Sequence, residues 1–227
     1  MKKKTPYDYR GLSIRTINDP RFSHLKLLLG WVAYFALYFL TENLIPLEKC
    51  NIVHSPLDDM IPFCEYFVIF YWTWFLLIAG SLAYTMFYNV EAFKKLQIYI
   101  MITQALAMLT YIVWPSVQDL RPDTFARNNI FTDIVRFIYS FDTPSGVCPS
   151  LHVAYSLAVL SVGLKDRDLS PLLKALLSLY VLMVCLSVCF IKQHSVIDIA
   201  AAIPVCLIGE AVLYGKDYWL KKLKKQN

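Results

Sequence analysis

The sequence predicts an all-α fold: a bundle of six transmembrane helices with both termini cytoplasmic and an external loop that carries an amphipathic helix. Three observations predict it. Hydrophobic residues make up 57% of the 227-residue chain, more than a water-soluble domain usually contains. Several long segments are apolar enough to cross a bilayer. Lys and Arg are concentrated in every second connection between these segments, as membrane topology requires.

Five segments contain the roughly 20 largely apolar residues that a membrane-spanning helix needs. They cover residues 25–45, 63–88, 96–114, 172–191 and 195–214. A sixth apolar segment, 152–164, is shorter, and at about 1.5 Å per residue it rises only some 20 Å. We therefore expect one end of this helix, the one with His152, to lie below the membrane surface. The chain shows no internal repeat, and we interpret residues 1–227 as a single domain.

The basic residues predict the orientation of the spans. With a cytoplasmic N-terminal segment, 1–24, most of the 22 Lys and Arg residues fall on the cytoplasmic side, including those of the C-terminal sequence KKLKKQN. The net charge of +5 needs no nucleic-acid partner, because anionic lipid headgroups attract basic cytoplasmic segments. We expect a multi-pass integral protein of the plasma or inner membrane. The external connections contain the acidic residues Glu48, Asp58, Asp59, Asp119, Asp123, Asp133 and Asp142.

The longest predicted connection after residue 24 is the external loop 115–150. Its sequence NNIFTDIVRFIYSFD predicts an amphipathic helix that lies in the membrane interface and covers a site between the spans. The apolar residues at helical spacing are Ile130, Phe131, Ile134, Val135, Ile138 and Phe141.

Two ionisable residues stand near the start of the last span. His194 and Asp198 are four residues apart, so in a helix they share one face and can form a hydrogen bond. If Asp198 accepts from Nδ1–H, the other ring nitrogen keeps its lone pair, and the positive end of the helix dipole disfavours protonation of the ring. These are the properties of a nucleophilic imidazole. A purely structural polar pair between packed helices is the alternative.

The sequence CPSLHVAYS contains a second polar group of residues. Pro149 and Ser150 before an apolar run predict a helix start with Ser150 as its cap. The free backbone N–H groups of such a start bind anions, phosphate among them. His152 in the first turn would then be close enough to donate a proton to a leaving oxygen. The alternative is an interfacial histidine without a catalytic role.

A third motif lies in the external loop, in the sequence DLRPD. Arg121 carries a planar guanidinium that suits phosphate oxygens. In chain order, Arg-Pro, then Pro-Ser-x-His at the start of one span, then His-x-x-x-Asp at the start of another resembles the type 2 phosphatidic acid phosphatase superfamily. All three motifs fall on the external side of the predicted topology.

The resemblance implies roles for individual residues. His194 would attack phosphorus to form a phosphohistidine and Asp198 would orient it, while His152 would protonate the leaving group. Arg121, Ser150 and nearby N–H groups would bind the phosphoryl oxygens. The substrate would be a membrane lipid phosphate, and no metal or other cofactor is implied. These roles agree with the residue types, because preorganised donors stabilise the charge that develops on phosphoryl oxygens.

The chain departs from the family pattern at two basic positions. Trp114 stands where the family has Lys, and Val188 stands where it has the Arg of a Ser-Arg pair. Candidates to replace these cations are Lys192, Arg127 and Arg136. We favour Lys192, although it can equally extend to the interface as a solvated side chain, and Arg136 can pair with Asp133 on its own helix.

A third departure bears on the reaction type. Leu151 replaces the Gly of the usual Pro-Ser-Gly-His. The resulting Pro-Ser-Leu-His is similar to the branch that includes inositol phosphorylceramide synthases, which transfer a phosphoryl headgroup to an alcohol. The motif is therefore compatible both with hydrolysis of a lipid phosphate and with transfer of its phosphoryl group to an alcohol.

The predicted function is a membrane lipid-phosphate phosphatase or phosphotransferase that acts at the extracytoplasmic face. One alternative is a non-catalytic lipid-binding or scaffolding protein that kept the fold. Another is a metal site built from His152, His194 and Asp198. A transporter is disfavoured by the absence of a repeat and by the confinement of the polar groups to one side of the bilayer.

Overall fold

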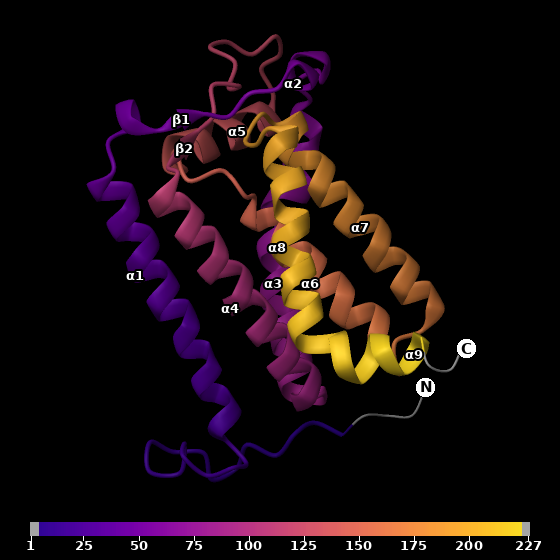
Figure 1. Ribbon diagram of the computed structural model, residues 1–227. Helices are drawn as coiled ribbons and strands as arrows, with labels where there is room; N and C mark the ends of the chain where they lie inside the picture. The colour runs from indigo at the N-terminus through magenta and orange to yellow at the C-terminus, as the bar shows by residue number, and fades with distance from the viewer. Residues whose placement is uncertain (1–4, 224–227) are drawn as a thin grey trace.

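The computed structural model describes residues 5–223, and almost all of its regular structure is helical (Figure 1). Two short strands, β1 (Asn51–Ile52) and β2 (Ser116–Val117), pair in parallel, with Asn51 opposite Ser116. The prediction of an all-α fold is confirmed. The helices are α1 (Leu29–Leu44), α2 (Pro56–Met60), α3 (Val68–Tyr88), α4 (Val90–Val113), α5 (Ile130–Phe141), α6 (Leu151–Lys165), α7 (Pro171–Phe190), α8 (Val196–Tyr214) and α9 (Lys221–Leu223).

Five helices in the described part of the chain are long and apolar enough to cross a membrane. They match the five long segments predicted from the sequence, so the expectation of a multi-pass membrane protein is supported. Some of these spans include short helical turns next to α1, α3 and α8. Their bounds are Ser23–Leu44, Glu65–Tyr88, Val90–Val113, Pro171–Phe190 and Val196–Leu220.

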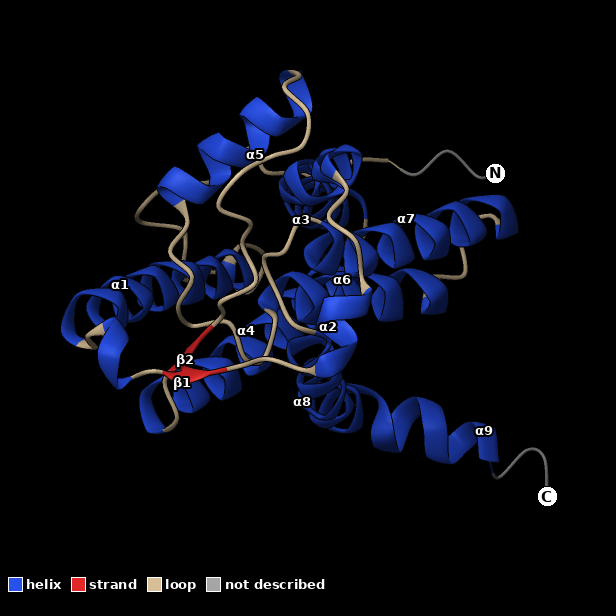
Figure 2. Ribbon diagram, turned by 90° about the horizontal axis from the view of Figure 1, so that it is seen from above, coloured by secondary structure: helices blue, strands red, loops and turns tan. Residues whose placement is uncertain are grey.

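The sixth apolar helix, α6, occupies the centre of the bundle. It has 15 residues and packs against α3, α4, α7 and α8, as the view along the bundle shows (Figure 2). Because other helices surround it, many residues of α6 are buried within the bundle. Whether it spans the membrane remains a prediction.

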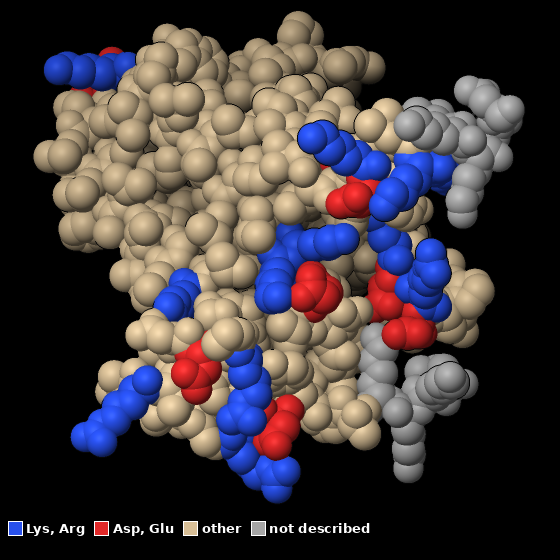
Figure 3. Space-filling model, turned by 60° about the horizontal axis from the view of Figure 1, so that its bottom comes forward, with Lys and Arg blue, Asp and Glu red and all other residues tan. Residues whose placement is uncertain are grey.

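The two ends of the bundle differ. In Figure 1 the upper end carries β1, β2, α2 and α5, together with the starts of α6 and α8. The lower end carries the described start of the chain and α9, and Lys and Arg side chains are numerous there (Figure 3). Five of the basic residues in the topology prediction lie outside the described residues: Lys2, Lys3, Lys4, Lys224 and Lys225.

Helix α5 forms where the loop sequence predicts it. The Asn129 side chain accepts hydrogen bonds from the N–H groups of Phe131 and Thr132, and this cap begins the helix. Val135 and Ile138 are buried against the bundle, whereas Phe137 and Phe141 are exposed. The helix therefore covers the upper end of the bundle and leaves part of its apolar surface outside.

Candidate active site

The start of α8 presents the predicted histidine–aspartate pair. His194 Nδ1 lies 3.1 Å from Asp198 Oδ2, and both residues are buried. Asp198 Oδ2 also accepts from the N–H of Ser195 at 3.0 Å, because Ser195 and Asp198 form the capping box of α8. A carboxylate oxygen only accepts, so Nδ1 donates in this bond, and Nε2 is left for other chemistry.

The start of α6 is joined to the start of α8. Ser150 is buried, its Oγ accepts from Val153 N–H as the cap of α6, and its own N–H donates to the Asp198 carbonyl at 3.1 Å. Tyr111 Oη donates to the Pro149 carbonyl at 2.7 Å. The Ser150 hydroxyl is therefore part of the helix cap, and its backbone couples the two helices.

His152 lies between two aromatic rings and faces His194. Its ring stacks on Tyr71 with 4.3 Å between centroids and contacts Trp74 at 4.2 Å. The His152 and His194 ring centroids are 5.7 Å apart. Within the described residues, His152 Nε2 is buried and has no hydrogen-bond partner. Buried polar atoms are normally bonded, so this nitrogen has a hydrogen-bonding capacity that the described residues leave unused.

Both histidines line a cavity of about 700 Å³ between α1, α3, α5 and α6. This volume is within the usual range of ligand sites. Its walls are mainly aromatic, and its lining includes Asp142 and Gln193 together with the two histidines. The aromatic lining residues are Trp31, Tyr34, Phe35, Tyr38, Tyr71, Trp72, Trp74, Phe75, Tyr111, Phe137, Phe141 and Tyr155.

Arg121 is close to this site but does not line the cavity. Its Nε and Nη2 donate to Gln193 Oε1 at 3.0 and 2.6 Å. Nη2 also donates to the Asp142 carbonyl, and Nη1 donates to the Tyr139 carbonyl. The guanidinium therefore ties the external loop to the residue before His194.

Lys192 is directed away from the cavity. Its Nζ donates to the carbonyls of Asp58 and Ile61 at 2.7 and 2.6 Å. Its backbone has a φ of 55°, a left-handed conformation that is uncommon for residues other than glycine. The structure thus brings His194, Asp198 and His152 together and leaves the side chains of Arg121, Ser150 and Lys192 committed to backbone and amide partners.

The other candidate cations are paired as well. Arg127 Nη1 lies 3.2 Å from Glu65 Oε1. Arg136 Nη1 lies 2.7 Å from Asp133 Oδ1, the i, i+3 pair that the sequence suggested as an alternative.

Asp58, which the sequence identifies only as an external acid, is part of the site's framework. It is 1% exposed. Its Oδ2 accepts from Ser195 Oγ at 2.6 Å and its Oδ1 accepts from Val196 N–H at 2.8 Å. The carboxylate therefore binds the positive end of α8. The capping pattern from Ser55 to Asp58 signals the start of α2, but not the contact with α8.

Asp142 and Gln193 are further residues that the motifs do not include. Asp142 Oδ2 accepts from Tyr71 Oη at 3.0 Å and from Gln193 Nε2 at 3.1 Å. Burial raises the pKa of the Asp142 carboxyl group above its ordinary value, and hydrogen bonding from Tyr71 partly opposes this shift. The one available sequence signal is that an acid follows the amphipathic helix directly.

In the described part of the chain, no three His, Cys, Asp or Glu side chains converge as metal ligands would. His194 Nδ1 is already bonded to Asp198. The geometry offers no support for the alternative of a metal site at His152, His194 and Asp198.

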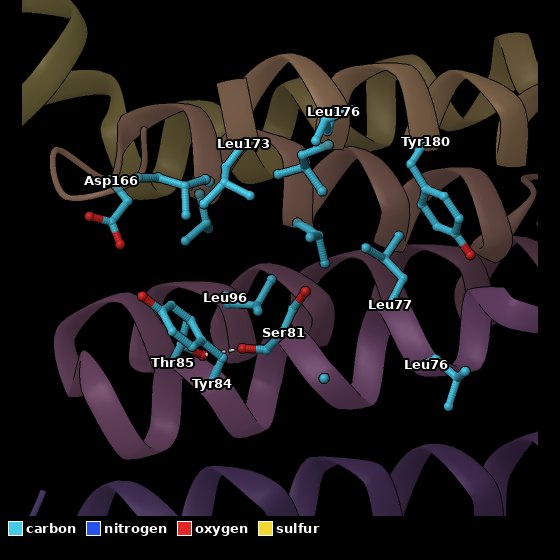
Figure 4. Close-up of a pocket in the computed structure, with 16 residues that line it drawn as sticks. Leu76, Leu77, Ser81, Tyr84, Thr85, Leu96, Asp166, Leu173, Leu176 and Tyr180 are labelled. Atoms are coloured by element: carbon cyan, nitrogen blue, oxygen red, sulfur yellow. Dashed lines mark hydrogen bonds between the residues drawn. The ribbon is translucent and has the colours of Figure 1, made fainter. Parts of the chain in front are cut away.

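A second cavity lies between α3, α6 and α7 and is lined mainly by leucine side chains (Figure 4). Its volume is about 440 Å³. The Thr85 hydroxyl near one end donates to the Ser81 carbonyl of its own helix at 2.7 Å. Its lining residues contain neither histidine nor a basic side chain.

Comparison of the chain with models of known protein families found no match, and no curated protein or solved structure matches it. The resemblance to the type 2 phosphatidic acid phosphatase superfamily therefore stays a prediction from the three sequence motifs.

Proposed function

We propose that this protein is a membrane enzyme that removes or transfers the phosphoryl group of a lipid phosphate through a phosphohistidine on His194. One observation carries the proposal. His194, hydrogen-bonded to Asp198, and the unpartnered nitrogen of His152 meet at the head of one apolar cavity. Covalent phosphoryl transfer needs a nucleophile that a carboxylate orients and a separate group that transfers a proton.

The proposed reaction has two displacements. His194 Nε2 attacks phosphorus, the bond from phosphorus to the leaving oxygen breaks, and His152 supplies a proton to that oxygen. Asp198 holds Nδ1–H and stabilises the positive charge on the imidazole. Water or an alcohol then attacks phosphorus, the P–N bond breaks to restore His194, and the O–H proton of the acceptor is returned to His152.

The cavity supports a lipid as the substrate. α1 forms one wall, and none of its residues is buried in the protein. Trp31, Tyr34 and Tyr38 of this helix line the cavity opposite Trp74 and Ile78 of α3. A ligand with its phosphate at the histidines would place an apolar chain between these walls, which match such a chain in polarity.

We further propose six spans with both termini cytoplasmic, which puts the site at the extracytoplasmic face of the plasma or inner membrane. The arrangement is supported by the concentration of basic residues at the lower end and by the position of both described ends of the chain there. The starts of α6 and α8 lie at the opposite end.

The test uses detergent-purified protein and a panel of lipid phosphates with chelator present. Phosphate release is measured first, and transfer to an alcohol second, with His194→Ala as the control. Release or transfer by the wild type, lost in the variant, supports the enzyme and separates hydrolysis from transfer. Full activity of the variant would contradict the proposed nucleophile.

A second candidate is a lipid-binding membrane protein without catalysis. The observation that favours it is that Arg121 and Lys192 are both committed to protein acceptors, so neither cation is presented to the cavity. This candidate is supported if the folded protein binds a lipid phosphate but shows neither hydrolysis nor transfer, and if the His194→Ala variant binds the same lipid phosphate as tightly as the wild type.

A further inference from the structure

Asp142 presents a carboxylate to the same cavity as the two histidines. Among the residues that line this cavity, it is the one with a carboxylate side chain. Asp198 is 0% exposed and its Oδ2 is bonded to His194 and Ser195. A carboxylate at the cavity wall is thus distinct from the one that orients the nucleophile.

The surroundings of Asp142 hold it in place and leave one oxygen open. Oδ2 accepts from Tyr71 Oη and Gln193 Nε2, and the backbone carbonyl accepts from Arg121. Within the described residues, Oδ1 makes no hydrogen bond, so it is available to a group in the cavity. Tyr71 contacts both Asp142 and the proposed proton donor, because its hydroxyl donates to Asp142 and its ring stacks on His152.

We propose that Asp142 is the base that activates the acceptor in the second displacement, a role that depends on the proposed phosphohistidine. Water or an alcohol loses its O–H proton to Asp142 Oδ1 as its oxygen bonds to phosphorus. The P–N bond breaks, and its electron pair returns to His194 Nε2. Passage of the proton from Asp142 to His152 restores both groups for the next turnover.

Burial supports this role, because it raises the pKa of Asp142 and a base is most effective when its pKa lies closer to the working pH. The rate of phosphohistidine breakdown should therefore rise with pH as Asp142 ionises. Other groups facing Asp142 contribute to the shape of this profile. They are Tyr71 of α3, His152 of α6, His194 before α8, Glu42 of α1 and Arg121 of the external loop.

The test compares Asp142→Asn with the wild type, using radiolabelled phosphatidic acid in detergent micelles and quenching in base. The amide keeps an oxygen for Tyr71 and Gln193 and removes the base. We expect phosphohistidine to form at the wild-type rate and to break down about 100-fold more slowly, so labelled protein accumulates. Asp133→Asn is the matched control, because Asp133 is exposed on α5 and pairs with Arg136.

A second variant separates catalysis from structure. Asp142→Gly leaves room for a small acid, so added formate should restore breakdown of the phosphohistidine. Breakdown of labelled Asp142→Asn at the wild-type rate, or equal slowing of formation and breakdown without formate rescue, would overturn the role of Asp142. If the wild type itself forms no phosphohistidine and releases no phosphate, the proposed function fails, and this inference fails with it.

Discussion

The two cavities share helices α3 and α6, yet their chemistry differs. The larger one ends at residues from connections and helix starts, where His152, His194, Asp142 and Gln193 meet. The smaller one is lined mostly along helix sides, with many leucines, and also by Asp166 and Leu169 of the α6–α7 connection, and its Thr85 hydroxyl is bonded to its own helix. Helix interiors satisfy their backbone groups and present apolar surface, whereas helix starts and connections supply free polar groups. The polar side chains of the larger cavity therefore gather where helices begin or are connected.

The largest effect is expected at the larger cavity, from loss of the proposed nucleophile. His194→Ala should lower phosphoryl transfer at least about 1,000-fold, because no other group replaces a covalent nucleophile. The measurement is product formation by purified protein. His54→Ala is the matched control, since His54 is at the same end of the bundle but bonds to Asp59 and Asp119 outside the cavity, and it should retain activity.

The framework of the larger cavity depends on Asp58. Asp58→Asn weakens the charged hydrogen bonds to Ser195 and Val196 and should lower the free energy of unfolding by about 1–3 kcal/mol. A lower midpoint in thermal unfolding of the detergent-solubilised protein would show this. Asp59→Asn changes the exposed neighbour and should leave the midpoint within a degree or two. Equal midpoints for Asp58→Asn and the wild type would refute the capping role.

Neighbouring residues of α3 allow the two cavities to be filled separately. Ala79 lines the aromatic cavity and Gly80 the leucine-lined one, and a Cβ at Gly80 meets no atom within 4 Å. Ala79→Trp should raise KM for long-chain lipid phosphates about 10-fold, the size of effect that altered apolar fit produces. Gly80→Trp should leave KM unchanged. The proposed lipid site is contradicted if Gly80→Trp has the larger effect.

The smallest expected effect concerns pH. His54 donates hydrogen bonds to the carboxylates of Asp119 and Asp59, and these carboxylates raise its pKa above the ordinary value of 6.5. A raised pKa in the folded state means that this contact stabilises the protein below about pH 6.5 and that the contribution is lost as pH rises through the folded value. The thermal midpoint should fall slightly over that range. His54→Gln should remove the part of the pH dependence of the thermal midpoint that comes from His54. If the variant keeps the pH dependence of the wild type, His54 does not contribute to it.

Much of the framework could be predicted from local patterns. Apolar length predicted the five long helices. The hydrogen bond of His194 with Asp198 was also predicted and is present, although His194 precedes Ser195, the cap of α8, and so lies outside the helix rather than on its face. Ser150 was predicted as a helix cap and is one. These features depend on neighbours in the chain, which a sequence displays directly.

What the sequence by itself determined is which segments are apolar helices and which polar residues stand at their starts, because helix geometry relates residues three and four apart. Only the tertiary structure decided which of these groups share a cavity. It bound Lys192 to carbonyls near α2, placed Asp58 on the start of α8, and brought Asp142 to His152 and His194. Such contacts join residues far apart in the chain, and they follow from how the external connections pack over the helix ends rather than from any local spacing.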